Sequence, residues 1–311
     1  MTLVFSDPLF ERHQTGFHPE CAARVQGAAR YLDGLPWFSQ LARGRITAAT
    51  EELIVRTHSQ HLIDQARTLA AGGGGYLDAD TYLSPASFDV ALHAAGTAMH
   101  AVDQVLRAGA EHREAFCLMR PPGHHATAQL SMGFCVFNNI AIAAHYARDV
   151  YGLQRILIVD FDVHHGNGTQ DIFYEDAGVY FFSIHRFPFY PGSGTADETG
   201  RGRGLGTTLN IPLSMGTSRQ LYREAFQRGL DTAVERCRPE LILISAGFDA
   251  HKDDPVGSLG LEIEDYDFMT RSIKQAAASV CDGRIVSCLE GGYNLEVLPL
   301  LVAAHLEALR R

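Results

Sequence analysis

Residues 155–168 read RILIVDFDVHHGNG, and this stretch decides the fold of the 311-residue chain. It opens with a continuous apolar run, which is typical of a strand buried in a sheet. Residues two apart along a strand point to the same face, so Asp160, Asp162 and His164 are expected to share one side at its end. Carboxylates and an imidazole directed at one point are difficult to explain as packing and indicate metal ligands.

Three other segments are expected to bring polar side chains to the same place. The run LILISAGFD at 241–249 ends in Asp249, and the loop RPPGHH at 120–125 carries two adjacent histidines. A further strand pattern at 284–289 is followed by EGGY at 290–293. Ligands bind at the carboxyl ends of strands in parallel sheets, so these loops are expected to converge on one active site.

Strand and helix patterns alternate along the chain, with no linker between them. Strands are predicted at 3–5, 115–119, 155–160, 179–184, 241–245 and 284–289. Helices are predicted at 19–32, 51–70 (as one helix or two), 84–108, 138–151, 218–236, 264–280 and 295–309. In the helix at 84–108, Ser84 is the expected cap and Pro85 the first helical residue. The alternation predicts an α/β fold, with helices on both faces of a parallel sheet, in a single domain over 1–311.

The composition narrows the class of protein. A net charge of −10 argues against nucleic-acid binding, which needs a basic surface; it fits a cationic substrate, although solubility alone also explains it. The six cysteines form no CxxC pair and are expected to be reduced. No signal peptide and no membrane-spanning run are apparent, which predicts a cytoplasmic protein. Other histidines are expected on helix or loop surfaces without a role: His58, His61, His93, His100, His112, His145, His251 and His305.

The predicted metal ligands are two carboxylates and one imidazole: Asp162, His164 and Asp249. Catalytic zinc sites use three protein ligands and leave one position for water. This set suits a Lewis acid acting on a carbonyl group. Iron(II) or cobalt remains open, since ligand type alone does not decide between these metals.

The adjacent histidines are predicted to divide the proton transfer between them. His125 is the expected general base for the attacking water and the acid for the leaving amine, while His124 gives electrostatic support. Asp160 and Asn167 are the candidate partners that orient the two rings, with Asp160 assigned to His124. Tyr293, after two glycines, is expected to donate its hydroxyl to the oxyanion of amide hydrolysis.

Four motifs resemble the zinc-dependent histone deacetylase superfamily, which also contains acetylpolyamine amidohydrolases. They are RPPGHH at 120–125, DFDVHHGNGT at 160–169, AGFD at 246–249 and GGY at 291–293. The resemblance covers nearly the whole chain. It implies a three-layer αβα, arginase/deacetylase-like fold around a mainly parallel eight-stranded sheet. Class II and many bacterial members of this superfamily have asparagine at the position of Asn167, so the resemblance implies a class II-like enzyme.

The resemblance also implies cofactors and a substrate tunnel. One Zn²⁺ per chain is expected on Asp162, His164 and Asp249. The tunnel is expected to be lined by Gly133, Phe134, Tyr190, Val256 and Gly291. A structural potassium ion is expected near Asp160, Asp162, His164, Ser183 and Ile184, and a second near Phe173 and Val179.

The leading hypothesis is a zinc-dependent amidohydrolase that removes acetyl or another short acyl group from lysine ε-amines, by attack of metal-activated water. The alternative substrate is an acetylpolyamine or other small acyl-amine. Val256 stands where the polyamine-specific relative has a glutamate, so polyamine specificity is less favoured. A catalytically inactive acyl-lysine binder and a binuclear arginase-type hydrolase are the other classes considered. The expected partner is an acyl-lysine peptide or protein, or a small acyl-amine, without nucleic acid or membrane; a homo-oligomer is left open.

Overall fold

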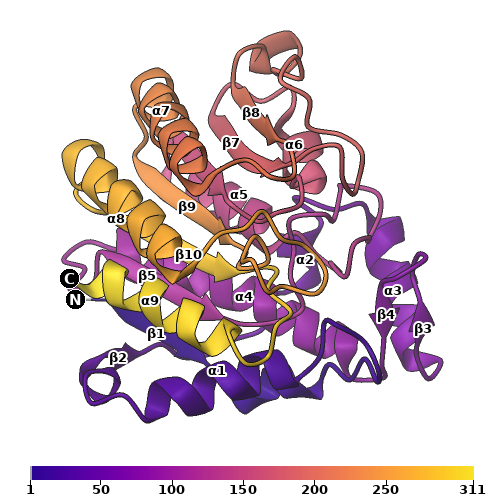
Figure 1. Cartoon of the computed structure of the whole chain (residues 1–311). Helices are drawn as coiled ribbons and strands as arrows, with labels where there is room; N and C mark the ends of the chain where they lie inside the picture. Colours follow the sequence, from indigo (N-terminus) through magenta and orange to yellow (C-terminus); the bar gives the residue numbers. More distant parts are fainter. Residues whose placement is uncertain (1) are drawn as a thin grey trace.

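An eight-stranded sheet forms the centre of the computed structural model, which describes residues 2–311 (Figure 1). The strand order is β2-β1-β5-β10-β9-β6-β7-β8, and each neighbouring pair is parallel. The strands are β1 Leu3–Ser6, β2 Ala42–Arg43, β5 Glu114–Leu118, β6 Ile156–Asp160, β7 Val179–Arg186, β8 Thr208–Leu213, β9 Leu241–Ala246 and β10 Ile285–Leu289. Residue 1, the first of the expected domain, lies outside the described residues.

Helices cover both faces of the sheet, so the predicted three-layer architecture is confirmed (Figure 1). The helices are α1 Ala23–Asp33, α2 Glu51–Ile54, α3 Gln60–Ala71, α4 Ser87–Leu106, α5 Asn139–Tyr151, α6 Asn167–Phe173, α7 Arg219–Cys237, α8 Ile263–Val280 and α9 Leu298–Arg310. One layer runs from α1 through α9 and α8 to α7, each helix packing on the next. On the other face, α4 contacts β1, β5 and β10, and α5 packs beside it against β9.

A small antiparallel hairpin stands apart from the main sheet. It consists of β3 Gly75–Tyr76 and β4 Tyr82–Leu83, and it lies beside α3 (Figure 1). Short 3-10 helices complete the described elements at Pro8–Arg12, Phe38–Gln40 and Gly202–Gly204. No helix within residues 2–311 is long and apolar enough to cross a bilayer.

The strands that carry the site form the middle of the core. Every residue of β5, β6, β9 and β10 is buried. Strands covered by helices on both sides must be apolar on both faces, which is why these segments read as continuous hydrophobic runs. The order β5-β10-β9-β6 makes them immediate neighbours, so the loops after them leave the sheet side by side.

Three predicted helix starts are wrong. The helix expected from residue 295 begins at Leu298, after a turn in which the Asn294 side chain accepts the backbone N–H groups of Glu296 and Val297. The helix expected from Ser84 begins at Ser87, because the backbone N–H of Ser87 donates to the carbonyl of Ser84 in a preceding turn. Ser84 and Ser87 then bond to each other through their hydroxyls at 2.9 Å. The helix expected from residue 19 begins at Ala23 because Glu20 is drawn into a buried ion cluster instead.

Some histidines expected on the surface are buried. His58 is buried and accepts the backbone N–H of Asn138 at Nε2, with its Nδ1 bonded to the carbonyl of Thr127, both at 2.8 Å. His305 is fully buried on α9, where its two ring nitrogens lie at hydrogen-bond distance from Thr270 and Ser287. His112 and His251 are also buried. Helical periodicity did not reveal His58 and His305 because polar groups inside the core bond to each of these imidazoles.

Candidate active site

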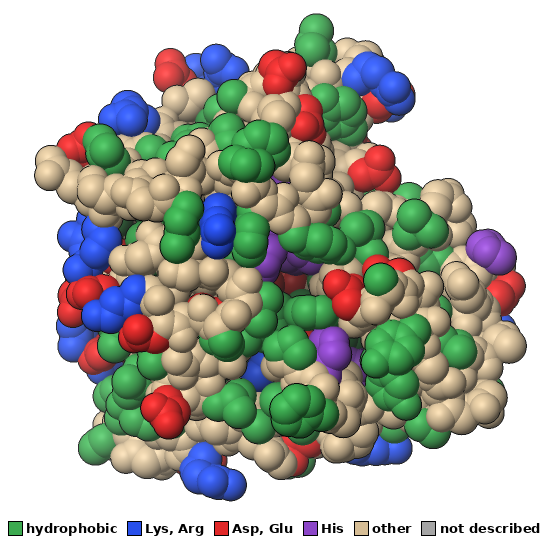
Figure 2. All heavy atoms as spheres, turned by 45° about the vertical axis from the view of Figure 1, so that its right-hand side comes forward, with side chains coloured by type: hydrophobic (Ala, Val, Ile, Leu, Met, Phe, Trp, Pro, Cys, Tyr) green, Lys and Arg blue, Asp and Glu red, His purple; other side chains and the backbone are tan. Residues whose placement is uncertain are grey.

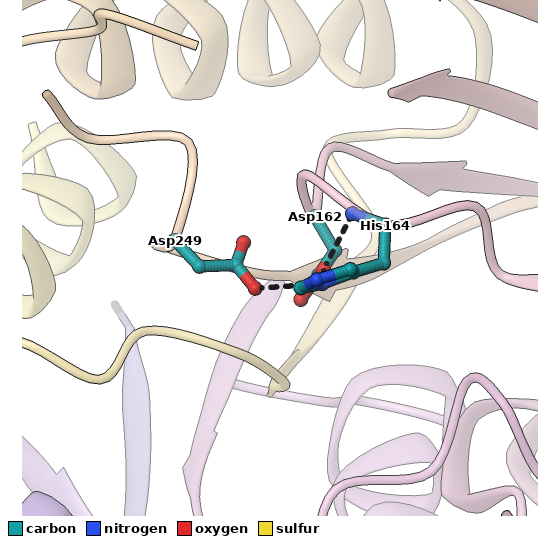
Figure 3. Close-up of side chains that lie close together, drawn as sticks. All are labelled: Asp162, His164 and Asp249. Carbon is teal, nitrogen blue, oxygen red and sulfur yellow. Dashed lines mark hydrogen bonds and ion pairs between the residues drawn. The ribbon is translucent and has the colours of Figure 1, made fainter. Parts of the chain in front are cut away.

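Asp162, His164 and Asp249 point toward one another at the carboxyl edge of the sheet (Figure 3). Asp162 and His164 follow β6, whereas Asp249 follows β9, the adjacent strand. Nδ1 of His164 lies 3.1 Å from Oδ1 of Asp162 and 3.1 Å from Oδ2 of Asp249. All three residues are buried, so two carboxylates and an imidazole share one site removed from water.

The geometry of this cluster fits a small divalent cation. Ligand atoms about 2.0–2.2 Å from a tetrahedral zinc ion lie roughly 3.3–3.6 Å apart, close to the spacing of these donors. Oδ2 of Asp249 is buried and accepts no hydrogen bond within residues 2–311, since Nδ1 of His164 bonds to Asp162. Burial and the nearby charge of Asp162 raise the pKa of Asp249 to about 7. A cation would supply the missing partner and offset the paired negative charge.

Backbone groups hold the two carboxylates in place. Oδ1 of Asp249 accepts the N–H of Val163 at 2.9 Å, which ties the loop after β9 to the loop after β6. Oδ2 of Asp162 accepts the N–H of Gly291 at 2.8 Å, which adds the loop after β10. A Cβ on Gly291 would lie 2.2 Å from Oδ2 of Asp249 and 2.6 Å from Oδ2 of Asp162, so the position requires glycine.

The tandem histidines lie beside this cluster with the partners expected from the sequence. Nδ1 of His124 lies 3.0 Å from Oδ2 of Asp160, and Nδ1 of His125 lies 2.7 Å from Oδ1 of Asn167. The two imidazole centroids are 4.0 Å apart. Asn167 lies at the start of α6, an element that the sequence patterns did not predict.

Their surroundings push the two pKa values in opposite directions. Burial opposes the charged form of His124, but the charges of Asp162 and Asp160 prevail and raise its pKa to about 10. Burial lowers the pKa of His125 well below its usual value, and the positive charge of His124 lowers it further. His124 is therefore cationic at neutral pH while His125 is neutral.

A pocket of about 160 Å³ with a mixed polar and apolar wall reaches these residues. Its lining is Asp80, His125, Gly133, Phe134, His164, Phe189, Tyr190, Val256 and Tyr293. Phe189 stacks on the His164 ring at 5.1 Å, and Tyr190 meets the His125 ring edge-on at the same distance. In Figure 2, histidine side chains are visible in a hollow of the surface among hydrophobic side chains. Four of the five predicted tunnel residues line the pocket, and Gly291 lies behind it against the carboxylates.

Two supporting residues were not assigned a role from the sequence. Oε2 of Glu290 accepts the backbone N–H groups of Gly123 and His124, at 2.6 and 3.2 Å, and burial raises its pKa to about 7. Arg24 donates from Nε to the carbonyl of Gly292 at 2.7 Å, and its guanidinium lies 4.8 Å from the Tyr293 ring centroid. The position of Glu290, directly after a strand and before GGY, was the available signal for its role.

The residues expected around potassium lie on adjoining elements. Asp160 at the end of β6 is in register with Ser183 of β7, and Ile184 follows. Phe173 ends α6, and Val179 begins β7. Potassium binding at either place stays a prediction.

The fold and the site together define a three-layer αβα protein whose polar loops gather at the carboxyl edge of a parallel sheet. The chain belongs to the histone deacetylase family, since residues 18–309 match the histone deacetylase domain. This membership makes it a hydrolase that acts on amides.

Individual relatives agree with this assignment. The chain is 40% identical to histone deacetylase 14, chloroplastic, of Arabidopsis thaliana, over 99% of this chain and 76% of that protein. It is 39% identical to a histone deacetylase-like amidohydrolase of Pseudomonas aeruginosa, over 84% of this chain and 68% of the relative. The crystal structure of the HDA15 HD domain superposes with a TM-score of 0.92 at 34% identity, covering 99% of this chain and 87% of that one.

Proposed function

We propose that this hydrolase is a zinc-dependent deacetylase that removes acetyl, or another short acyl group, from the ε-amine of lysine. The observation that carries the proposal is the buried Asp162–His164–Asp249 cluster, whose imidazole lines a pocket that also contains the neutral His125. Phe134, Phe189 and Val256 in the pocket wall suit the methylene chain of acyl-lysine, because such a chain carries no charge between its backbone and its amide.

The three cluster residues would hold the zinc ion, one per chain. Bound there, it supplies Lewis acidity, which polarises the amide carbonyl and lowers the pKa of water. Iron(II) is the competing metal for this oxygen and nitrogen donor set.

His125 is the proposed general base. The oxygen of Asn167 accepts the Nδ1 proton of His125, which leaves the lone pair on Nε2 of the neutral ring for a proton from water. The same nitrogen then returns that proton to the leaving amine. His124 stays protonated against Asp160 and contributes positive charge as the tetrahedral species forms.

Tyr293 is the proposed oxyanion donor. Its ring lines the pocket and meets Phe134 edge-on at 5.7 Å. Burial raises the pKa of Tyr293 well above its usual value, so the hydroxyl keeps its proton and can donate it as a hydrogen bond. A donor placed for such an oxyanion is worth about 3–4 kcal/mol in comparable hydrolases.

The pocket wall favours acyl-lysine over acetylated polyamines. Val256 offers no charge to a second ammonium group. Although Asp80 is an acidic side chain of the lining, the wall at Val256 gives a polyamine no counter-charge.

Kinetics on matched substrates test the proposal. We expect the zinc-loaded protein to have a higher kcat/KM for an acetyl-lysine peptide than for acetylputrescine or acetylspermidine, with one zinc per chain. Val256→Glu should shift the preference toward the polyamines. Val256→Gln, in which glutamine has the shape of glutamate without its charge, should not. A higher kcat/KM for the polyamines in the parent protein would reverse the assignment of substrate class, and two metals per chain would favour a binuclear mechanism.

A further inference from the structure

Asp254 joins the two loops that carry Asp249 and Tyr293. Its Oδ2 accepts the backbone N–H of Tyr293 at 2.7 Å and that of Asn294 at 3.3 Å. Its Oδ1 accepts the N–H groups of Val256 and Gly257, at 2.9 and 3.0 Å. One carboxylate thus accepts four backbone hydrogen bonds, two from each loop.

The loop that contains Asp254 is also bonded to Asp249, a proposed metal ligand. The carbonyl of Asp249 accepts the N–H of Ser258 at 2.7 Å, which closes the loop 249–258 on itself. A Cβ on Gly257 would lie 2.4 Å from that same carbonyl oxygen. Asp254 therefore connects the backbone of Tyr293 to the backbone of Asp249 through the short, tightly packed loop 249–258.

The neighbouring residue provides a contrast. Asp254 is 8% exposed, whereas the side chain of Asp253 is 58% exposed and forms a 3.9 Å ion pair with His251. A buried carboxylate is costly unless its acceptors are filled, and backbone N–H groups fill those of Asp254. The two adjacent side chains thus differ in whether they join the loops, although the backbone carbonyl of Asp253 accepts the side-chain N–H of Asn294 at 2.7 Å.

We propose that Asp254 is a positioning residue that sets the distance between the Tyr293 hydroxyl and the Asp162–His164–Asp249 cluster. This inference rests on the function proposed for Tyr293 as the oxyanion donor. Asp254 touches no reacting atom and acts through the backbone of Tyr293. Its effect belongs to the transition state, because the oxyanion gains charge only there.

The substitution Asp254→Asn tests this role with little change of shape. An amide offers one acceptor oxygen, and its NH₂ group would face two N–H donors on one of the loops. We expect kcat to fall by about 10–100-fold, the cost of misplacing a catalytic group by roughly 1 Å. KM, zinc content and the far-UV circular dichroism spectrum should stay close to those of the parent. Asp253→Asn is the matched control, and its kcat should remain within about twofold of the parent.

A double-mutant cycle with Tyr293→Phe separates positioning from a general structural role. If Asp254 acts through Tyr293, adding Asp254→Asn to Tyr293→Phe should lower kcat by less than about threefold, since the group that it positions is already gone. Full multiplication of the two single effects would overturn the inference, as would an unchanged kcat in Asp254→Asn. Unimpaired activity of Tyr293→Phe would instead contradict the proposed role of Tyr293.

A second variant covers the case in which the asparagine protein does not fold. Asp254→Glu keeps four acceptor positions on a side chain one methylene longer, so the loops stay bonded but are displaced. It should also lower kcat more than it raises KM, with zinc bound at parent stoichiometry. Parent-like kcat in a folded Asp254→Glu protein would show that loop spacing does not matter and would overturn the inference. Assays use whichever of the acetyl-lysine peptide and acetylputrescine the parent turns over faster.

Discussion

At the scale of single residues, the site depends on contrast between adjacent side chains. His124 and His125 differ by one position, yet the first bonds to a carboxylate and the second to an amide oxygen. These partners orient the two rings, while burial and neighbouring charges push the two pKa values apart. The sequence of the histidine pair alone therefore does not assign the proposed roles of the two rings.

The first prediction concerns the ranking of these two histidines. His125→Ala should lower kcat by about 10²–10⁴-fold because it removes the proposed general base, and His124→Ala should cost less. Both proteins should retain zinc, which metal analysis can check. A larger loss in His124→Ala would mean that the base is misassigned.

The second prediction is the acid limb of the pH–rate profile. His125 must be neutral to accept a proton, and its pKa is lowered well below the usual value of 6.5. Activity should therefore persist as the pH falls through 6.5 and decline only at lower pH. A limb with its midpoint above 6.5 in kcat/KM would contradict the neutral state assigned to this ring.

The third prediction tests the close approach at Gly291. Gly291→Ala places a methyl group against the carboxylates of Asp162 and Asp249, so zinc binding and activity should both be lost. Gly27→Ala is the control, because a Cβ there meets Pro299 at an ordinary 3.6 Å inside α1. That control should bind zinc normally and unfold at the same or a slightly higher temperature. Full zinc content in Gly291→Ala would show that the loop can move away.

At the scale of elements, strand ends were the predictable part of this molecule. The apolar runs now seen as β6 and β9 placed Asp162, His164 and Asp249 correctly at one sheet edge, because buried parallel strands leave a strong pattern. β8 was missed: it lies at the sheet edge, where its mixed burial gives no continuous run. α6 was missed because seven residues that begin with Asn-Gly carry too little periodicity.

Tertiary ion contacts could not be predicted from local pattern at all. Glu20 bonds to Arg120 through both carboxylate oxygens and to Arg24, and His13 lies 3.4 Å away. These residues are buried and come from two distant parts of the chain, residues 13–24 and Arg120. The cluster ties the N-terminal segment to the loop before the tandem histidines.

The fourth prediction follows from this cluster. Glu20→Ala leaves two buried guanidinium groups without their carboxylate, so the free energy of unfolding should fall by about 3–5 kcal/mol. Glu175→Ala breaks an exposed pair with Arg201 and should have a much smaller effect. Urea denaturation of both variants measures the difference. Equal losses would mean that the buried cluster contributes no more than a surface pair.

At the scale of the whole molecule, buried neutral histidines make stability depend on pH. His58 needs the neutral tautomer, since Nε2 accepts one hydrogen bond while Nδ1 donates another. Burial lowers its pKa to about 4, and burial lowers that of His305 to about 3. Such groups stabilise the fold fully above pH 6.5, the pKa of histidine in the unfolded chain. This contribution is lost as the pH falls toward their folded-state pKa.

The fifth prediction isolates one of these histidines. Between pH 7 and pH 5, His58 should account for about 2 kcal/mol of the fall in the free energy of unfolding. His58→Gln should therefore show a shallower fall over this range, even if it is less stable at pH 7. His61→Gln, at an exposed position one turn away, should behave like the parent. Parallel curves for all three proteins would mean that His58 is protonated in the folded state.

The β3–β4 hairpin lies outside the main sheet, yet Asp80, between its strands, reaches the pocket wall. The residues proposed for bond cleavage are instead anchored on central strands. Insertions or substitutions in the β3–β4 hairpin can therefore change the pocket wall near Asp80 without moving the residues proposed for bond cleavage. Related chains that share the same interior could in this way come to act on very different molecules.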